Sequence, residues 1–306
     1  MKKNILTRTP VVLVLALLCC SLWGSAFPCV KIGYRLFCVG SEDTASQLLF
    51  AGCRFFLAGF LVILIGSISA RRLLLPGKSA LMPIAVLALF QTIIQYFFFY
   101  VGLAHASGVK SSIITAASTF FTLVFAAVFF RYETLTLKKL LGCLIGFAGV
   151  VLITTAGTSL TGSMTLRGEG FVLISSASYA VSSCMVKGYS KKESPLLLCG
   201  YQFMLGGFIL AAAGVLMGGR LTVTTPLSFL LLFYMACISA VAYTLWSILL
   251  KHNPVSRISV FSFCNPVIGV ILSALLLGEQ NQAFSIYGLL ALILVSLGII
   301  VVYIEK

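Results

Sequence analysis

Trp23-Gly-Ser-Ala-Phe-Pro-Cys-Val-Lys31 is an apolar stretch that ends on a lysine, and it recurs in altered form as Tyr179-Ala-Val-Ser-Ser-Cys-Met-Val-Lys187. In both copies an aromatic residue stands eight positions before the lysine. Further matches follow in the same order along the chain: 54–60 with 202–208, 103–113 with 249–259, and Glu133 with Glu279. The ordered matches predict that the chain consists of two related halves.

The composition places both halves in a membrane. Of the 306 residues 60% are hydrophobic and only 9% are charged, whereas a soluble domain carries about 25% charged residues. A membrane-spanning helix needs about 20 apolar residues. Ten apolar runs are separated by short loops that hold Gly, Pro, Ser and charged residues: 9–30, 45–69, 79–104, 111–130, 140–156, 170–186, 196–217, 227–250, 258–278 and 284–304.

The first of these runs also resembles a secretory signal peptide, because Lys2, Lys3 and Arg8 precede it. The run continues without a charge from residue 9 to residue 30, which is long enough to span a bilayer. We interpret it as a retained first helix.

The basic residues indicate how the chain is oriented. With ten spans, fifteen of the 21 Lys and Arg residues fall on the side of the termini and five on the other side, while Arg54 lies within a span. Loops rich in Lys and Arg stay in the cytoplasm. We therefore expect a multi-pass protein of the cytoplasmic membrane with both termini cytoplasmic.

Five spans in each half make the two halves enter the membrane from opposite sides. The predicted fold is an all-α polytopic membrane protein of ten transmembrane helices, in two inverted five-helix repeats at residues 1–158 and 159–306. Inverted repeats are typical of secondary transporters, whose substrate site lies near the bilayer midplane between the halves.

Several motifs resemble the EamA-type transporters of the drug/metabolite transporter superfamily. They are the Trp-Gly-Ser-x-Phe-x-x-x-Lys stretch at 23–31, Arg54-Phe55, Gly102-Leu103, and the glutamates that close the fourth and ninth helices. The resemblance covers nearly the whole chain and implies a ten-helix bundle that moves small metabolites, often exporting amino acids. The proline common in the fourth helix of this family is absent here, while Pro266 is present in the ninth, which puts a hinge shared by both halves in doubt.

Polar and aromatic side chains inside the spans are the candidates for substrate binding, because polar groups in hydrocarbon usually face a cavity or another helix. Aromatic residues with a polar group suit a ligand that is partly apolar and partly polar. Hydroxyl groups also form hydrogen bonds between helices, and aromatic rings also pack in the core. A structural role and a substrate-binding role therefore both stay open for these residues. The candidates are Trp23, Ser25, Gln95, Tyr96, Tyr100, Ser118, Tyr179, Ser183, Tyr243, Trp246 and Asn265.

Arg54 is the one charge well inside a span, and Gln202 stands at the matching position of the second half. An arginine can bind a substrate carboxylate through two parallel hydrogen bonds. It can equally bind helix-end carbonyls or extend toward the interface. We favour the structural role.

The sequence argues against catalysis and against a metal or cofactor. The ten cysteines lie mostly in apolar runs and behave as small hydrophobic residues. A lipid-modifying enzyme would need a nucleophile with a base, or a metal cluster. His105 and His252 fall on opposite sides of the membrane in the predicted topology, so they cannot share such a site. All seven carboxylates lie in loops or at helix ends, so a proton relay at the midplane is not expected.

We therefore expect a secondary transporter for export or exchange of amino acids or related amphipathic solutes by alternating access. The alternatives are a multidrug, nucleobase or sugar carrier and a lipid-modifying integral membrane enzyme. The expected partners are a small-molecule substrate and the lipid bilayer, without nucleic acid, and the chain is expected to be a monomer or weak dimer.

Overall fold

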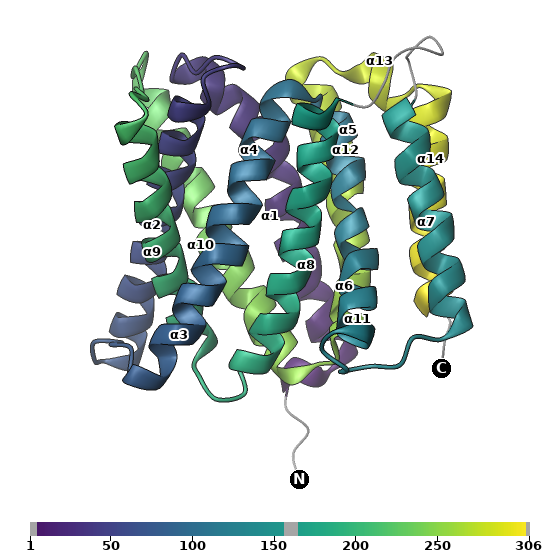
Figure 1. Ribbon diagram of the computed structural model, residues 1–306, viewed down its shortest axis with the longest axis horizontal. Helices are drawn as coiled ribbons and strands as arrows, with labels where there is room; N and C mark the ends of the chain where they lie inside the picture. The colour runs from purple at the N-terminus through teal and green to yellow at the C-terminus, as the bar shows by residue number, and fades with distance from the viewer. Residues whose placement is uncertain (1–4, 156–164, 304–306) are drawn as a thin grey trace.

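The computed structural model describes residues 5–155 and 165–303. Eight helical segments in these ranges are long and apolar enough to cross a membrane, and they run side by side in one bundle (Figure 1). The chain is a polytopic helical membrane protein. The eight segments are α1 (Thr9–Leu36), α2 (Thr44–Ala70), α3–η2–α4 (Lys78–His105), α5–α6 (Gly108–Val128), η3–α8 (Leu166–Tyr189), α9 (Pro195–Leu216), α10 (Pro226–His252) and a segment at Arg257–Leu277 that ends with α12 (Cys264–Leu277).

The two remaining apolar runs of the sequence lie on α7 (Leu137–Thr155) and α14 (Ile286–Tyr303). These helices pack on each other at one edge of the bundle (Figure 1). Their backbones approach closely, since a Cβ on Gly298 would lie 2.5 Å from the carbonyl oxygen of Gly142. The short elements of the described chain are η1 (Ile5–Thr7), α11 (Val255–Ser259), η4 (Val260–Phe263) and α13 (Gln280–Ala283).

Glycines also let α2 and α9 cross in close contact. A Cβ on Gly207 would lie 2.3 Å from the amide nitrogen of Phe56, and one on Gly59 would lie 2.4 Å from the carbonyl oxygen of Gly200. Small residues of this kind allow membrane helices to pack backbone to backbone. The α2–α9 contact joins the first half of the chain to the second.

The repeated stretches lie at the centre of the bundle. Helix α1, which holds the first stretch, packs on α10 and α12. Helix α8 (Phe171–Tyr189), which holds the second, packs on α4 (Gln95–His105) and α6 (Ala117–Val128). Each repeated stretch thus contacts helices of the opposite half.

Besides α3–η2–α4, two spans are interrupted near their middle. Between α5 (Gly108–Thr115) and α6, the amide of Ala116 donates to the carbonyl of Ile113, and the Thr115 hydroxyl donates to the carbonyl of Ser111 at 2.7 Å. Such hydroxyl bonds bend helices. In the other half the turn η4 interrupts the segment Arg257–Leu277 just before Pro266, which has no N–H to donate. Both spans are therefore broken at matching positions, although only one contains a proline.

The first turn of α1 and the last turn of α14 lie at the same end of the bundle (Figure 1). Two loops meet at one end of the molecule, where the Ser79 hydroxyl donates to Glu193 Oε1 at 2.8 Å. At the opposite end, the amide of Arg220 donates to the Ser46 hydroxyl at 2.8 Å. Each of these two contacts joins segments that the sequence predicts to lie on the same side of the membrane.

Candidate functional site

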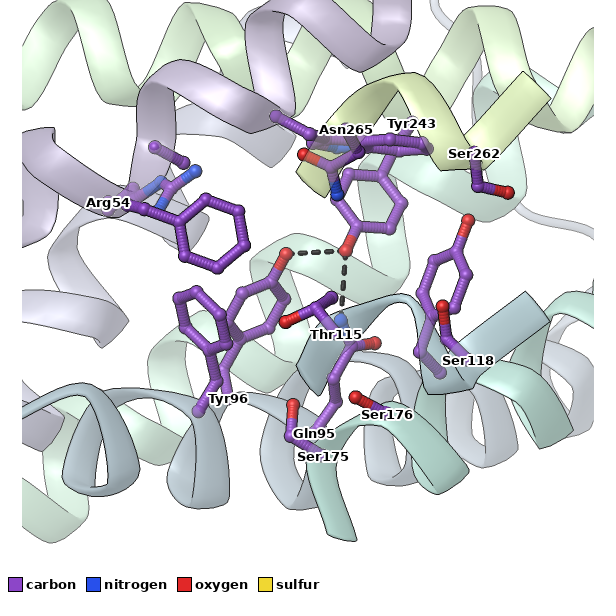
Figure 2. Close-up of a pocket in the computed structure, with 15 residues that line it drawn as sticks. Arg54, Gln95, Tyr96, Thr115, Ser118, Ser175, Ser176, Tyr243, Ser262 and Asn265 are labelled. Carbon is purple, nitrogen blue, oxygen red and sulfur yellow. Dashed lines mark hydrogen bonds between the residues drawn. The ribbon is translucent and has the colours of Figure 1, made fainter. Parts of the chain in front are cut away.

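A small cavity lies between the two halves, at the level of the helix interruptions. Its volume is about 60 Å³, against about 300–1,000 Å³ for pockets that hold drug-sized ligands. Figure 2 shows its lining, with Arg54 at one end and Ser118 and Ser262 at the other. The lining residues are Trp23, Ala26, Phe27, Arg54, Gln95, Tyr96, Phe99, Thr115, Ser118, Ser175, Ser176, Tyr179, Tyr243, Ser262 and Asn265.

The cavity brings together many residues that the sequence singles out. Those on its lining are Trp23, Gln95, Tyr96, Ser118, Tyr179, Tyr243, Asn265 and Arg54. They come from α1, α2, α4, α6, α8, α10 and α12, so both halves contribute.

Other candidates lie away from the lining. Trp246 packs behind Trp23, with 5.0 Å between the ring centroids. Ser25 donates to the carbonyl of Leu22 and lies 2.9 Å from the Tyr234 hydroxyl. Ser183 is buried on α8, one turn beyond Tyr179.

Gln202 and Tyr100 also lie outside the lining. Gln202 accepts a hydrogen bond from the Thr92 hydroxyl at 2.6 Å and donates to Gln91 Oε1 at 3.1 Å, which ties α9 to η2 (Ala88–Ile94). Tyr100 is fully buried and accepts a hydrogen bond from Arg54. Gln202 and Arg54 match in sequence but differ in surroundings.

Trp23 is the centre of an aromatic cluster that forms one wall. Its ring meets Tyr179 and Tyr243 edge-on, at centroid distances of 6.0 Å and 5.0 Å. Edge-to-face ring pairs at such distances are favourable. Together with Trp246, these rings come from α1, α8 and α10.

The Tyr243 hydroxyl links the aromatic wall to the polar part of the site. Gln95 Nε2 donates to it at 3.0 Å, and it also shares a hydrogen bond with the Tyr96 hydroxyl (Figure 2). One hydroxyl of the second half therefore connects two residues of α4 in the first.

Several buried polar atoms on the lining have no hydrogen-bond partner within the described residues. Among them are Trp23 Nε1, Gln95 Oε1 and Asn265 Oδ1. A buried polar group without a partner costs about 1–3 kcal/mol. The cavity thus presents both a donor and acceptors to whatever enters it.

The Arg54 side chain is 1% exposed and is held by two hydrogen bonds. Its Nε donates to the carbonyl of Met235 at 3.0 Å, and Nη1 donates to the Tyr100 hydroxyl at 2.9 Å. The guanidinium thereby connects α2 to α10 and α4.

Seven lining residues are absent from the candidates listed from the sequence: Ala26, Phe27, Phe99, Thr115, Ser175, Ser176 and Ser262. Thr115 and Ser175 belong to stripes of hydroxyl residues at helical spacing, which is a usable signal. Phe27 and Phe99 carry no such signal, because 24 phenylalanines are spread through the apolar runs.

The model of the EamA-like transporter family matches this chain twice, at residues 11–155 and 166–304. The chain belongs to the EamA-like transporter family. An uncharacterized transporter of Archaeoglobus fulgidus is 26% identical and covers 87% of this chain and 90% of its own length. The uncharacterized inner membrane transporter YedA of Escherichia coli (strain K12) is 28% identical, with coverages of 90% and 88%.

A third relative of this EamA-like chain has a more specific name. It is a probable amino-acid metabolite efflux pump of Salmonella typhimurium, 28% identical, with coverages of 90% of this chain and 89% of its own. One solved crystal structure shares the fold, with a TM-score of 0.67 and 17% identity, and covers 96% of this chain and 99% of that one. Family and relatives identify a multi-pass membrane transporter and not an enzyme.

Proposed function

We propose that this EamA-like transporter exports a small amphipathic metabolite, of the amino-acid type, through the cavity between its two halves. The observation that carries the proposal is the lining itself, in which aromatic rings of three helices and unpartnered polar atoms line one cavity. Ligand sites combine an apolar wall with a few polar groups that orient the ligand. The proposed binding residues are Trp23, Gln95, Tyr96, Ser118, Tyr179, Tyr243 and Asn265.

The helix pairing supports two inverted five-helix halves, residues 1–158 and 159–306, whose boundary lies outside the described residues. The contacts of α1 with α10 and α12 correspond to those of α8 with α4 and α6, as a two-fold axis in the membrane plane would require. The α2–α9 and α7–α14 pairs then lie on that axis. The two separate matches to the family model also support the division.

In the proposed orientation both termini are cytoplasmic, and α7 and α14 complete a set of ten transmembrane helices. The distribution of fifteen basic residues on one side and five on the other supports this orientation. We propose that the chain acts in the cytoplasmic membrane without a cofactor.

Alternating access agrees with the size of the cavity and with the broken helices. A volume of about 60 Å³ accommodates a few water molecules and no amino acid, so a solute enters only when the helices move apart. Interrupted helices around a central site are typical of transporters with inverted repeats. The name of the Salmonella relative supports export of an amino-acid metabolite.

A thermal-shift screen of amino acids, nucleobases and sugars tests the proposal. The detergent-solubilised protein is expected to be stabilised by members of the amino-acid group. Trp23→Ala, which removes the ring at the centre of the cluster, should abolish that stabilisation. Phe229→Ala removes a ring that is 61% exposed on α10 and should preserve it. If both variants keep the wild-type shift, the cavity is not the binding site.

A further inference from the structure

We propose that the transported solute carries a carboxylate, and that Arg54 binds it. This inference rests on the proposed function, because it assigns the residue of the central cavity that binds the carboxylate of the solute. It starts from the charge of Arg54, which is 1% exposed in the middle of α2 and lies on the cavity lining.

The charge of Arg54 has no counter-ion among the residues that the structure describes. The described ion pairs of acidic residues lie at the helix ends: Glu42 with His105 and Arg167, Glu133 with Lys139, Glu169 with Lys110, and Glu279 with Lys31. Arg54 takes part in none of them. Fully buried charged side chains are rare in proteins unless they are paired.

The contacts of Arg54 hold its position and leave its charge uncompensated. Its two hydrogen bonds go to neutral acceptors, the carbonyl of Met235 and the hydroxyl of Tyr100. The ring of Phe55 lies 5.0 Å from its guanidinium carbon. A guanidinium has five N–H donors, and within the described residues no hydrogen bond involves Nη2. Because Nε and one N–H of Nη1 donate to the protein, the N–H groups of Nη2 and the second N–H of Nη1 are left to donate to a carboxylate.

Among the described lining residues, Arg54 carries the one positive charge. Away from Arg54 the lining carries hydroxyl groups, aromatic rings and the unpartnered amide oxygens Gln95 Oε1 and Asn265 Oδ1 (Figure 2). Amide oxygens and ring faces attract an ammonium group. Once the helices have moved apart, a zwitterion could therefore place its carboxylate at Arg54 and its ammonium against the rings and amide oxygens, whereas an organic cation would be repelled by Arg54.

Matched compounds that differ only in the carboxylate test this inference on the unmodified protein. We would measure thermal shifts of the detergent-solubilised chain with phenylalanine, phenylalaninamide and phenethylamine, and with leucine, leucinamide and isoamylamine. The acids are expected to stabilise the protein and to bind at least about tenfold more tightly than the amides and amines. The amides and amines lose the hydrogen bond between the carboxylate and the charged guanidinium. Equal or greater stabilisation by the amines or amides overturns the proposal, as does no stabilisation by either acid.

Variants then assign the preference to Arg54. Arg54→Gln introduces the residue found at the matching position 202 and should abolish the difference between acid and amide. Arg54→Lys keeps the charge and should retain part of the difference between acid and amide. Arg35→Gln removes an exposed arginine at the end of α1 and should leave it unchanged. Because the compound series uses the wild-type protein, the proposal remains testable if Arg54→Gln fails to fold.

The outcomes separate this inference from the proposed function. Loss of binding in Trp23→Ala with an undiminished acid preference in Arg54→Gln would leave the cavity as the binding site and refute the role of Arg54. Equal binding by Trp23→Ala and the wild type would refute the proposed function itself.

Discussion

The hydroxyl of Tyr243 joins two other polar side chains of the cavity lining. It bonds to Gln95 Nε2 at 3.0 Å and to the Tyr96 hydroxyl, while its ring packs against Trp23. Its loss would release two side chains of α4 that line the site. We expect the ligand to depend on this arrangement even without a direct bond to the hydroxyl.

Tyr243→Phe should therefore weaken ligand binding by about 1 kcal/mol, the usual net value of one hydrogen bond. The matched control is Tyr287→Phe, which removes a hydroxyl from a side chain that is 48% exposed on α14. Isothermal titration calorimetry with the ligand that gives the largest thermal shift measures the affinity of both variants. Equal affinities for the two variants would mean that the Tyr243 ring only packs.

The sequence predicts many of the cavity residues because polar and aromatic groups stand out in apolar spans. It does not predict which side of a helix faces the cavity. Ser25 lies two residues from Trp23 and bonds toward Tyr234 instead. Gln202 matches Arg54 in the repeat but bonds between α9 and η2, because the two halves diverge in what they pack against.

Close helix contacts through glycine decide the arrangement of the elements. At the α2–α9 crossing, a Cβ on Gly207 would lie 2.3 Å from the amide nitrogen of Phe56, a backbone atom that cannot rotate away. The repeat and the spans are visible in the sequence, but this pairing depends on which glycines meet. The helix break at Ala116 is equally hidden, since hydroxyl bonds and not a proline accompany it.

Gly207→Ala is expected to destabilise the protein by about 1–3 kcal/mol, as for other overpacked contacts. The control is Gly77→Ala, where the nearest atom to an added Cβ is Ser79 Oγ at 3.8 Å. Thermal unfolding in detergent compares them. A Gly207→Ala protein as stable as the control would show that α2 and α9 can move apart without loss of stability.

Glu279 holds the bundle together at the end opposite the termini. Its carboxylate accepts hydrogen bonds from the amides of Gly108 and Val109, at 3.1 Å and 2.8 Å, and lies 4.0 Å from Lys31 Nζ. A negative charge at a helix N-terminus is stabilising. This one carboxylate connects the start of α5 to α1, so we expect it to keep that end closed.

Glu279→Gln should open that end more often. Ser118→Cys, on the cavity lining, reports the opening through its reaction with an impermeant maleimide applied from that side, with exposed Cys38 replaced by Ser. We expect labelling about fivefold faster, which corresponds to a loss of about 1 kcal/mol. Glu193→Gln, at the other end, serves as the control. Unchanged labelling in Glu279→Gln would show that this contact does not close the cavity.

At the scale of the whole molecule, the two halves enclose one cavity that neither half forms alone. Trp23 and Gln95 come from the first half, and Tyr179, Tyr243 and Asn265 from the second. The repeat predicts this meeting at the centre. The sequence could not predict how closed the cavity is, because that depends on how far the helices stand apart.

Counterflow in proteoliposomes tests most directly whether this cavity carries a solute across the membrane. Vesicles containing the protein are loaded with the unlabelled acid that gives the largest thermal shift, and uptake of the labelled acid is followed. A carrier that exposes one site to each side in turn should show accelerated, transient accumulation of label. That accumulation should disappear in Trp23→Ala and persist in Phe229→Ala. Uptake that is independent of preloading, or equal in both variants, would contradict transport through the central cavity.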